Sequence, residues 1–414
     1  MANQNIIRFS EEFQEPTDKY IGRMIDFVKK NVKPDDKILI ALSGGVDSST
    51  VTTLAHRAVP NKIHPLFIDT GYMRIIGGKK EAEIIAETFK DMPNLEILDK
   101  SDYFYERTFG IKDANEKRLA FRKAYDEVLN TEAVKLGCNV HMDGTIKPDI
   151  IETVKKVKPQ SNVDNVFLFE KKIEPLASLY KFQVRKCAEV LKIPDPYRQP
   201  FPGPGLSVRV VGEINPEKLE AERTANAIVE EGVEDLFEKH YGKPFLYDEV
   251  LGERIPFQYF AATFDYKRDH NLHDKEREIK KYTESLIGKR VDVDILESKA
   301  TGVIYEGEES RRVYSPVVAL ETDEPVDTPL LEHLGNAIPE RFGVSRVLHQ
   351  IKPGFGKYAM SIRNVKSTDA VTAKPLINFP LYLSIASEIQ NECHGVGPVF
   401  QDITSKPPAT IEYE

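Results

Sequence analysis

The amino-terminal half of the chain alternates short apolar runs with segments of helical periodicity. Apolar residues recur at near-helical spacing over residues 17–31, behind Thr17 as N-cap, which predicts an entry helix. The apolar run 37–42 is typical of a strand buried in a parallel sheet, and helical spacing returns over residues 49–59. Further strands are expected at 63–68 and 95–98, with helices at 79–89 and 117–136. This alternation predicts an α/β domain with a doubly wound parallel sheet.

The pattern changes after a proline- and glycine-rich segment at residues 197–206. Its three prolines and two glycines exclude a helix or a central strand and predict a rigid loop at the end of the first domain. A charged helix over 216–231 then opens a region of different rhythm, which predicts a second, smaller α+β domain. The expected domains are residues 1–212 and 213–414.

The second domain contains a weak internal repeat, about residues 306–351 and 352–414. Arg312–Val317 parallels Lys357–Ile362, and similar strands at 344–351 and 396–403 close the two units. Each unit has the pattern strand, helix, strand, which predicts an internal duplication. The alternative is that two unrelated α+β units share this patterning.

Composition limits the classes of partner. The chain has 57 Lys and Arg against 66 Asp and Glu, a formal net charge of −9, so no general basic surface for nucleic acid is expected. The apolar runs are only strand-sized and the amino terminus is polar, so neither a transmembrane helix nor a signal peptide is expected. Three scattered cysteines, Cys138, Cys187 and Cys393, suit reduced thiols in the cytoplasm.

Candidate chemistry begins with a glycine loop between the first buried strand and its helix. Glycines let the backbone approach a ligand, and the helix N-terminus points amide donors and a positive dipole end at an anion. The loop lacks the Lys-Ser/Thr ending of the Walker motif, so we expect a pyrophosphate group held by amides and hydroxyls, with Asp47 as a Mg²⁺ ligand. A serine-capped turn without a ligand is the alternative, which the full motif disfavours. The loop consists of Ser43, Gly44, Gly45, Val46, Asp47, Ser48 and Ser49.

This loop resembles the signature of the N-type ATP pyrophosphatases, which adenylate a carbonyl oxygen before a nucleophile displaces AMP. Within that group the chain is similar to the GMP synthetases. Four blocks in the family's order carry the resemblance: FIDTG with Arg74, GTIKPDIIE (144–152), RQPFPGPGLSVRVVGE (198–213) and DITSKPPATIEYE (402–414). The resemblance implies an adenine nucleotide alpha hydrolase-like fold followed by a dimerisation-type domain. Residues 262–310 interrupt the match and are predicted to be an insertion.

The resemblance also implies cofactors and site residues. ATP and Mg²⁺ are the expected cofactors, with loop 43–49 and Asp69 binding ATP and with Asp47 and Lys158 acting in catalysis. Contacts to a purine nucleotide substrate are expected from Arg118, Gln258, Lys406 and Glu412.

The chain departs from the family at the lid. Where the family has Lys-Ser/Thr-His-His-Asn, residues 158–162 are Lys-Pro-Gln-Ser-Asn, so both histidines are missing. Asp143 replaces a glutamine, while Lys147 and Arg122 also differ from the family's residues. Either Lys147 or Arg122 restores the lost positive charge, or the acceptor is different.

The leading hypothesis is an ATP-dependent ligase that converts XMP to GMP. A paralogue that amidates or thiolates another nucleotide or base and a non-catalytic nucleotide-binding protein are the alternatives. The cysteines lack the context of a glutamine-hydrolysing nucleophile, so ammonia or a separate glutamine amidotransferase subunit is the expected nitrogen source. The repeat predicts a monomer or a weak homodimer.

Overall fold

The chain is described here by a computed structural model that covers residues 5–154, 169–242, 247–248, 253–254, 257–306, 309–367, 372–377 and 379–414. Lys158 and the altered lid at 158–162 lie outside the described residues. The chain forms two compact units. Unit 1 comprises Met1–Met73, Lys79–Arg107 and Leu119–Arg198, and unit 2 comprises Arg74–Gly78, Thr108–Arg118 and Gln199–Glu414.

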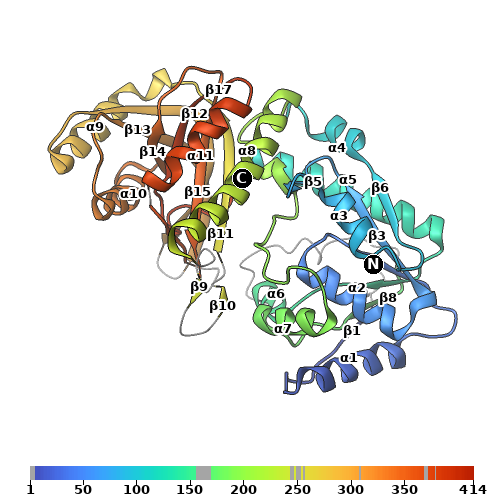
Figure 1. The fold of residues 1–414 in the computed structure, drawn as a ribbon. Helices are drawn as coiled ribbons and strands as arrows, with labels where there is room; N and C mark the ends of the chain where they lie inside the picture. The colour runs from blue at the N-terminus through green and yellow to red at the C-terminus, as the bar shows by residue number, and fades with distance from the viewer. Residues whose placement is uncertain are drawn as a thin grey trace. The chain divides into compact units, whose positions relative to one another are not determined.

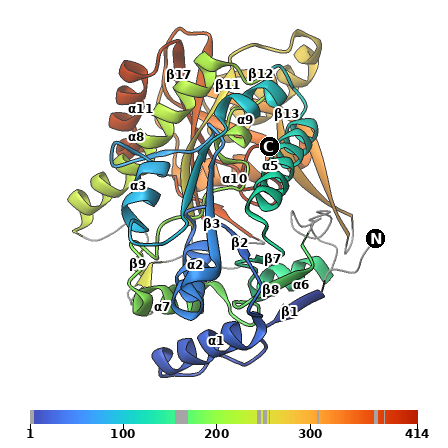
Figure 2. The ribbon, with the colours of Figure 1, turned by 90° about the vertical axis from the view of Figure 1, so that its right-hand side faces the viewer.

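Unit 1 is built on a six-stranded parallel sheet in the order β1-β8-β7-β2-β3-β6 (Figure 2). The predicted doubly wound α/β fold is therefore confirmed. The strands are β1 (Asn5–Arg8), β2 (Ile38–Ala41), β3 (Ile63–Asp69), β6 (Glu96–Asp99), β7 (Val140–Met142) and β8 (Lys171–Glu174). The helices are α1 (Thr17–Asn31), α2 (Val46–Ala58), α3 (Glu81–Thr88), α4 (Ser101–Thr108), α5 (Ala114–Leu136), α6 (Lys147–Val154) and α7 (Lys181–Leu191).

The order of the strands places the glycine loop at a switch point of the sheet. From β2 the chain adds β3 and β6 on one side and later returns to add β7 and β8 on the other. Helices α1, α2 and α7 pack together on β2, β7 and β8 through buried residues such as Tyr20, Leu54 and Cys187. Ligands of open α/β sheets bind at such a switch point, outside the carboxyl ends of the strands. Here these ends are the loops after β2 and β7.

Unit 2 contains a mixed sheet in the order β11-β15-β17-β14-β13-β12, with β16 paired to β15 (Figure 1). The strands are β11 (Phe257–Asp265), β12 (Val291–Glu306), β13 (Glu309–Thr322), β14 (Arg346–Lys352), β15 (Tyr358–Lys366), β16 (Lys374–Pro375) and β17 (Val396–Asp402). The helices are α8 (Pro216–Tyr241), α9 (His273–Ile287), α10 (Thr328–Phe342) and α11 (Phe379–Glu392). Outside the two large sheets are β4 (Ile75–Ile76), β5 (Lys79–Lys80), β9 (Tyr247–Asp248) and β10 (Glu253–Arg254), and the 3₁₀ turns are Pro60–Lys62, Gly205–Val208 and His270–Leu272.

The sheet of unit 2 has two matching halves. β13-α10-β14 and β15-α11-β17 are both strand–helix–strand units with parallel strands, and β14 and β17 meet antiparallel around the pair His349 and Gln401. Outside them β12 pairs antiparallel with β13, and β11 with β15. The half from α9 to β14 is continuous and lies in the sequence between β11 and β15 of the other half. Residue 262, where the predicted insertion begins, lies inside β11.

The strand pairing relates the halves differently from the sequence repeat. The repeat sets Val317 against Ile362. In the structure, however, Leu320 pairs with His349 of one central strand, and Ile362 pairs with Gln401 of the other. By strand pairing, Leu320 rather than Val317 is therefore the residue of β13 that corresponds to Ile362, three residues later than the sequence repeat suggests.

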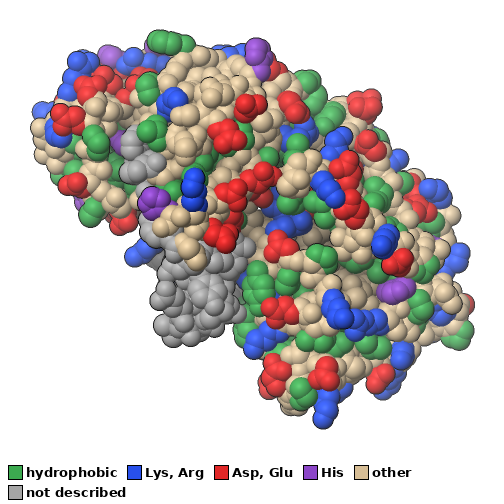
Figure 3. All heavy atoms as spheres, in the orientation of Figure 1, with side chains coloured by type: hydrophobic (Ala, Val, Ile, Leu, Met, Phe, Trp, Pro, Cys, Tyr) green, Lys and Arg blue, Asp and Glu red, His purple; other side chains and the backbone are tan. Residues whose placement is uncertain are grey.

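The described surface mixes charges of both signs. Figure 3 shows Lys and Arg side chains interspersed with Asp and Glu, with acidic side chains along the outer side of α8, where Glu231, Asp235 and Glu238 are exposed. None of the helices in the described part of the chain is long and apolar enough to cross a membrane.

Candidate functional site

The glycine loop runs from the end of β2 into α2, whose first turn is left open for an acceptor. Its N-cap residue Gly45 has extended backbone angles and supplies no side-chain cap. The serine hydroxyls brace the loop: Ser43 Oγ lies 3.0 Å from Ser48 Oγ, which donates to the carbonyl oxygen of Gly45 at 3.1 Å. Because a helix N-terminus attracts anions, this geometry suits a phosphate group.

Three glycines shape the loop for different reasons. Gly44 has φ +78°, and a Cβ there would lie 3.0 Å from Glu81 Oε1. Gly144, which follows β7, would place a Cβ 3.2 Å from the backbone of Asp47. A Cβ on Gly45 would meet only Ser43 Oγ, at 3.5 Å, so the protein itself leaves room there. Gly45 is thus the position where a side chain would enter the space above the loop.

Asp47 lies between a lysine and a second carboxylate. Lys181 Nζ, at the start of α7, is 2.6 Å from Asp47 Oδ2. Asp47 Oδ1 is buried and has no hydrogen-bond partner among the described residues. Burial raises the pKa of Asp149, and the negative charge of Asp47 raises it further. An unsatisfied carboxylate oxygen close to a second carboxylate suits Mg²⁺, which takes one or two carboxylates together with substrate phosphates. The described residues contain no group of three or more His, Cys, Asp or Glu side chains that could hold a metal ion.

Asp69 ends β3, and its carboxylate shapes the following turn. Asp69 Oδ1 accepts a hydrogen bond from the Gly71 amide at 2.9 Å, and Tyr105 Oη donates to the Gly71 carbonyl at 2.9 Å. Gly71 has φ +76°, and a Cβ there would lie 2.3 Å from Tyr105 Oη, so only glycine fits. The structure therefore places Asp69 at the carboxyl edge of the same sheet as the loop.

Sequence reasoning missed two cationic residues at the loop, Lys181 and Arg198. Arg198 Nη2 donates to the Gly44 carbonyl at 2.9 Å and to Glu81 Oε1 at 2.6 Å. Arg198 opens the proline–glycine block, and that motif could have identified it. Lys181 comes shortly after the carboxyl end of β8, a position typical of site residues in such sheets. The hydrophobic pattern did not reveal β8, so this indication was missed.

The departures from the family motif have partners within unit 1. Lys172 is buried, and its Nζ lies 2.8 Å from both Asp143 Oδ2 and Glu174 Oε1, so the carboxylate at position 143 is compensated locally. Lys147 Nζ lies 4.9 Å from the centre of the Tyr180 ring. Arg122 Nε is 3.9 Å from Asp126 Oδ2, and burial raises the pKa of Asp126 to about 6. Lys147 and Arg122 therefore contact Tyr180 and Asp126, whereas the cation that pairs with Asp47 is Lys181.

In unit 2, Glu412 is held by a buried arginine. Arg209 Nε and Nη2 donate to the two carboxylate oxygens of Glu412 at 3.0 and 3.1 Å, while Nη1 donates to Asn226 Oδ1 at 2.6 Å. Burial alone would lower the pKa of Arg209, but Glu412 and Glu230 raise it. The side chain of Arg209 has no exposed surface, whereas that of Glu412 is 18% exposed. Arg209 therefore fixes the orientation of the Glu412 carboxylate from the buried side, and Glu412 remains partly accessible.

Gln258 and Lys406 lie at the same end of the unit 2 sheet. Gln258, near the start of β11, pairs with Val365 near the end of β15, and its Nε2 donates to the Pro200 carbonyl at 3.0 Å. Val365 also pairs with Pro375 of β16, and beside this strand the backbone of Lys406 bonds to Ala373.

Arg118 lies in the first part of α5, beside a residue that fixes the carboxyl-terminal segment. Its Nη2 donates to Asn115 Oδ1 at 2.8 Å. The preceding Lys117 is buried and pairs with Glu414, whose carboxylate also accepts hydrogen bonds from Tyr314 Oη and the Gly212 amide. The segment that carries Glu412 is thus anchored within unit 2.

Comparison with known proteins gives two matching family models and relatives that match over most of the chain. Residues 355–413 match the GMP synthase C terminal domain, and residues 22–101 match the asparagine synthase family. The chain is 35% identical over 396 residues to one of the subunits of the glutamine-hydrolyzing GMP synthase of Saccharolobus solfataricus, covering 92% of this chain and 95% of the relative. It is 36% identical over 403 residues to the corresponding protein from Methanocaldococcus jannaschii, with 96% and 98% covered. A solved structure, the NH3-dependent NAD synthetase from Campylobacter jejuni, gives a TM-score of 0.34 at 19% identity and covers 44% of this chain and 77% of that chain.

Proposed function

The chain belongs to the family of these GMP synthase subunits, and on this premise we propose which of its residues carry the reaction. It is an ATP-dependent carbon–nitrogen ligase that amidates XMP to GMP. In this reaction the C2 carbonyl oxygen of XMP attacks the α-phosphate of ATP and pyrophosphate leaves. Ammonia then adds to the adenylated carbon and displaces AMP. The protein's part is to position two anionic nucleotides and to stabilise charge on the adenylyl group as it transfers.

We propose that unit 1 binds the phosphates of ATP through the amides and hydroxyls of residues 43–49. The observation that carries this proposal is Asp47, with one oxygen paired to Lys181 and the other buried without a partner, among the described residues, at an uncapped helix N-terminus. Lys181 supplies a positive charge where the leaving pyrophosphate needs one. Asp69 is proposed to contact the adenosine, and Lys158 to act on the charge that develops at the α-phosphate.

Mg²⁺ is proposed to bind Asp47 Oδ1 together with Asp149. Its chemistry in such a site is to neutralise phosphate charge and to orient the pyrophosphate leaving group. Asp47 is held in place for this by Lys181 on its other oxygen. Asp149 Oδ2 accepts a hydrogen bond from the Ile146 amide at 2.9 Å, which fixes the second carboxylate.

XMP is proposed to bind unit 2 through Arg118, Gln258, Lys406 and Glu412. A carboxylate and an amide suit the NH and carbonyl groups of a purine, and a lysine or arginine suits its phosphate. Glu412 is supported in this role by its bidentate contact with Arg209, which leaves one edge of the carboxylate accessible.

Nitrogen is proposed to come from free ammonium or from a separate glutamine amidotransferase subunit. The three cysteines are free and buried, and burial raises the pKa of Cys138 to about 11 and that of Cys187 and Cys393 to about 12. Thiols of this kind are poor nucleophiles at neutral pH. Reduced thiols also support a cytoplasmic location.

The test is to incubate the purified chain with MgATP, ammonium chloride and XMP and to measure pyrophosphate release and product mass. We expect GMP and pyrophosphate in equal amounts, and no product with glutamine as the sole nitrogen source. IMP, UMP and free xanthine serve as alternative acceptors. Pyrophosphate release with one of these but not with XMP would show that the acceptor is different. Release with XMP only after Gln160→His and Ser161→His are introduced together would show that the lid of this chain is disabled.

A further inference from the structure

Phe201, in the proline–glycine block of unit 2, is a partly exposed aromatic ring backed by two buried arginines. The guanidinium carbon of Arg74 lies 4.5 Å from the centre of the Phe201 ring, and that of Arg209 lies 5.1 Å from it. The side chains of Arg74 and Arg209 are 1% and 0% exposed. An arginine that covered the ring from the solvent would itself be exposed, so both lie on the protein side of the ring. The accessible part of the ring is therefore the part that the arginines do not cover.

A carboxylate on α8 fixes both arginines and, through them, the ring. Arg74 Nη1 donates to the two oxygens of Glu230 at 3.2 and 3.0 Å, and Arg209 Nη1 lies 3.8 Å from Glu230 Oε1. A guanidinium group over an aromatic ring is attracted by the electrons of the ring face. Phe201 is thus held in a defined position although it belongs to a loop.

The ring lies beside two residues to which the proposed function gives the polar edge of a purine. Pro200, which directly precedes Phe201, accepts a hydrogen bond from Gln258 Nε2 at 3.0 Å. Arg209, on the protein side of the ring, donates to both carboxylate oxygens of Glu412. Gln258 and Glu412 are both partly exposed. The accessible part of the ring is therefore bordered by an amide and a carboxylate that a ligand can reach.

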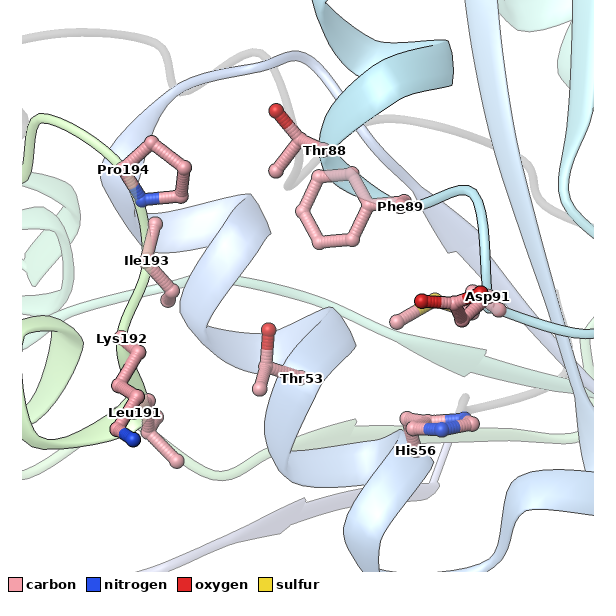
Figure 4. A pocket seen from close by; sticks show the side chains of 10 residues that line it. Thr53, His56, Thr88, Phe89, Asp91, Leu191, Lys192, Ile193 and Pro194 are labelled. Atoms are coloured by element: carbon pink, nitrogen blue, oxygen red, sulfur yellow. The ribbon is translucent and has the colours of Figure 1, made fainter.

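An aromatic ring in unit 1 shows by contrast what a stacking site requires. Phe89 lines a cavity of about 250 Å³ beside α2 (Figure 4). Its ring is only 6% exposed, because it packs in an apolar cluster with Leu42, Phe67 and Ile85. Phe89 therefore has no free face for a flat ligand, whereas Phe201 combines accessible ring surface with polar groups at its border.

We propose that the Phe201 ring is the platform on which the purine base of XMP stacks. The choice of ligand rests on the proposed function. There Gln258 and Glu412 bind the edge of the base, and Lys406 or Arg118 binds the phosphate, but none of them covers a face of the base. Each face of a purine is a π surface, and stacking on an aromatic side chain binds it regardless of the groups at its edge. A fixed ring also sets the plane of the base, which keeps the C2 carbonyl oxygen oriented for its attack on ATP.

The first test uses fluorescence. The chain contains no tryptophan, so Phe201→Trp introduces a single reporter into the full chain. We expect XMP to quench its emission saturably in the absence of ATP, whereas ribose 5-phosphate, which has no base, should not quench it. Phe355→Trp is the matched control, because Phe355 is fully exposed and precedes β15, at the opposite end of that strand from Val365, which pairs with Gln258. The control should show no saturable change and corrects for light absorbed by XMP.

The second test removes the ring. Phe201→Leu should raise the Kd for XMP, measured by calorimetry, at least tenfold, the magnitude typical of losing one stacked base. Phe201→Tyr, which keeps an aromatic face, should stay within twofold of the parent. The Kd for MgATP and the inhibition constant of ribose 5-phosphate against XMP binding should be the same in the parent and in Phe201→Leu. A merely structural role for Phe201 would weaken XMP and ribose 5-phosphate equally.

The outcomes separate the stacking platform from the proposed function. An unchanged Kd for XMP in Phe201→Leu, or no saturable quenching in Phe201→Trp, overturns the platform even when the chain converts XMP to GMP. Equal weakening of XMP and ribose 5-phosphate by Phe201→Leu also overturns it. Saturable quenching by XMP and a raised Kd, in a chain that releases no pyrophosphate with XMP, support the platform and reject the function. The two substitutions are independent, so if one of them prevents folding, the other decides.

Discussion

Lys181 Nζ lies 2.6 Å from Asp47 Oδ2, so the first residue of α7 is joined to the glycine loop by an ion pair. The two side chains are 37% and 27% exposed, and the pair is therefore accessible to a ligand. In the proposed complex Lys181 stays on Asp47 Oδ2, and Mg²⁺ binds Oδ1, which has no partner among the described residues. The pair would hold the carboxylate in position for the metal and would place the ammonium group beside the ATP phosphates.

We predict that Lys181→Ala reduces pyrophosphate release by about 100-fold, the magnitude typical of removing one preorganised charge-stabilising group. The affinity for MgATP, measured by calorimetry, should fall much less, because developing charge is affected more than the ground state. Lys186→Ala on the same helix is the matched control, since Lys186 is 3.9 Å from Glu15 and does not touch the loop. Equal losses in both variants would mean that α7 is merely destabilised.

Gly45→Val should abolish ATP binding in a chain that folds normally. Gly45 has φ −71° and ψ 158°, angles that valine adopts, and a Cβ there meets only Ser43 Oγ. The valine side chain therefore obstructs only the ligand. Gly22→Ala in α1, where a Cβ meets nothing within 4 Å, is the control and should raise stability by about 0.5–1 kcal/mol. If calorimetry shows unchanged ATP binding by Gly45→Val, the loop is a turn that does not bind the ATP phosphates.

In unit 1 the sequence predicted the strands that are buried through apolar side chains and missed one that is buried through charged side chains. β2 and β3 are apolar runs and were predicted, as was α1. β8 has the sequence Lys-Lys-Ile-Glu, and all four residues are buried. Its charges are compensated within unit 1, Lys171 by Asp36 and Lys172 by Asp143. A hydrophobic pattern cannot reveal a strand whose burial depends on ion pairs formed by distant residues, and with β8 the position of Lys181 was missed as well.

In unit 2 the family motifs predicted candidate residues but not the residues that hold them in place. Glu412 was predicted from the tail motif, yet Arg209, 203 positions earlier, holds it. The repeat was visible as similar strands, whereas the pairing around His349 and Gln401 depends on contacts between strands distant in the sequence. The helix predicted for 216–231 continues to Tyr241, since Gly242, with φ +67°, provides its cap.

Glu412→Gln should raise the KM for XMP by about tenfold, while leaving the affinity for MgATP unchanged. Glutamine retains one carbonyl acceptor for Arg209, but the buried guanidinium loses a charged partner, so we also expect a loss of about 1–3 kcal/mol in stability. Steady-state kinetics and thermal unfolding measure the two effects. Glu392→Gln, at an exposed end of α11, is the control. A lower melting temperature without any change in KM would leave Glu412 a structural role only.

Acid should weaken unit 2 through Asp402. This carboxylate has no exposed surface, and its Oδ2 lies 2.7 Å from Arg346 Nη1 and 3.0 Å from Arg363 Nη1. Burial alone would raise the pKa of Asp402, but the two arginines hold it below its ordinary value. A lowered native pKa means that the stabilisation is present above the ordinary value near 3.8 and is lost as the pH falls through the native pKa.

The variant Asp402→Asn tests this dependence. It should lose about 3–5 kcal/mol at neutral pH, because two buried guanidinium groups remain without a counter-charge. Its melting temperature should approach that of the parent as the pH falls below about 4, because the parent then loses the same interaction. Asp323→Asn, at an exposed position, should follow the parent throughout. A difference between parent and Asp402→Asn that stays constant down to about pH 2.5 would contradict the assignment.

The last prediction is that the chain is active as a monomer. The two halves of the unit 2 sheet meet through β14 and β17 in one chain, so each half already receives the antiparallel neighbour that an identical partner would otherwise supply. Sedimentation velocity at micromolar concentration should therefore give a single species with the mass of one chain, 47.0 kDa. The rate of pyrophosphate release per chain should stay constant on dilution to nanomolar concentration, because no contact between chains is lost. An obligate dimer whose activity disappears on dilution would show that the second half does not replace a partner and that part of the nucleotide site comes from another copy.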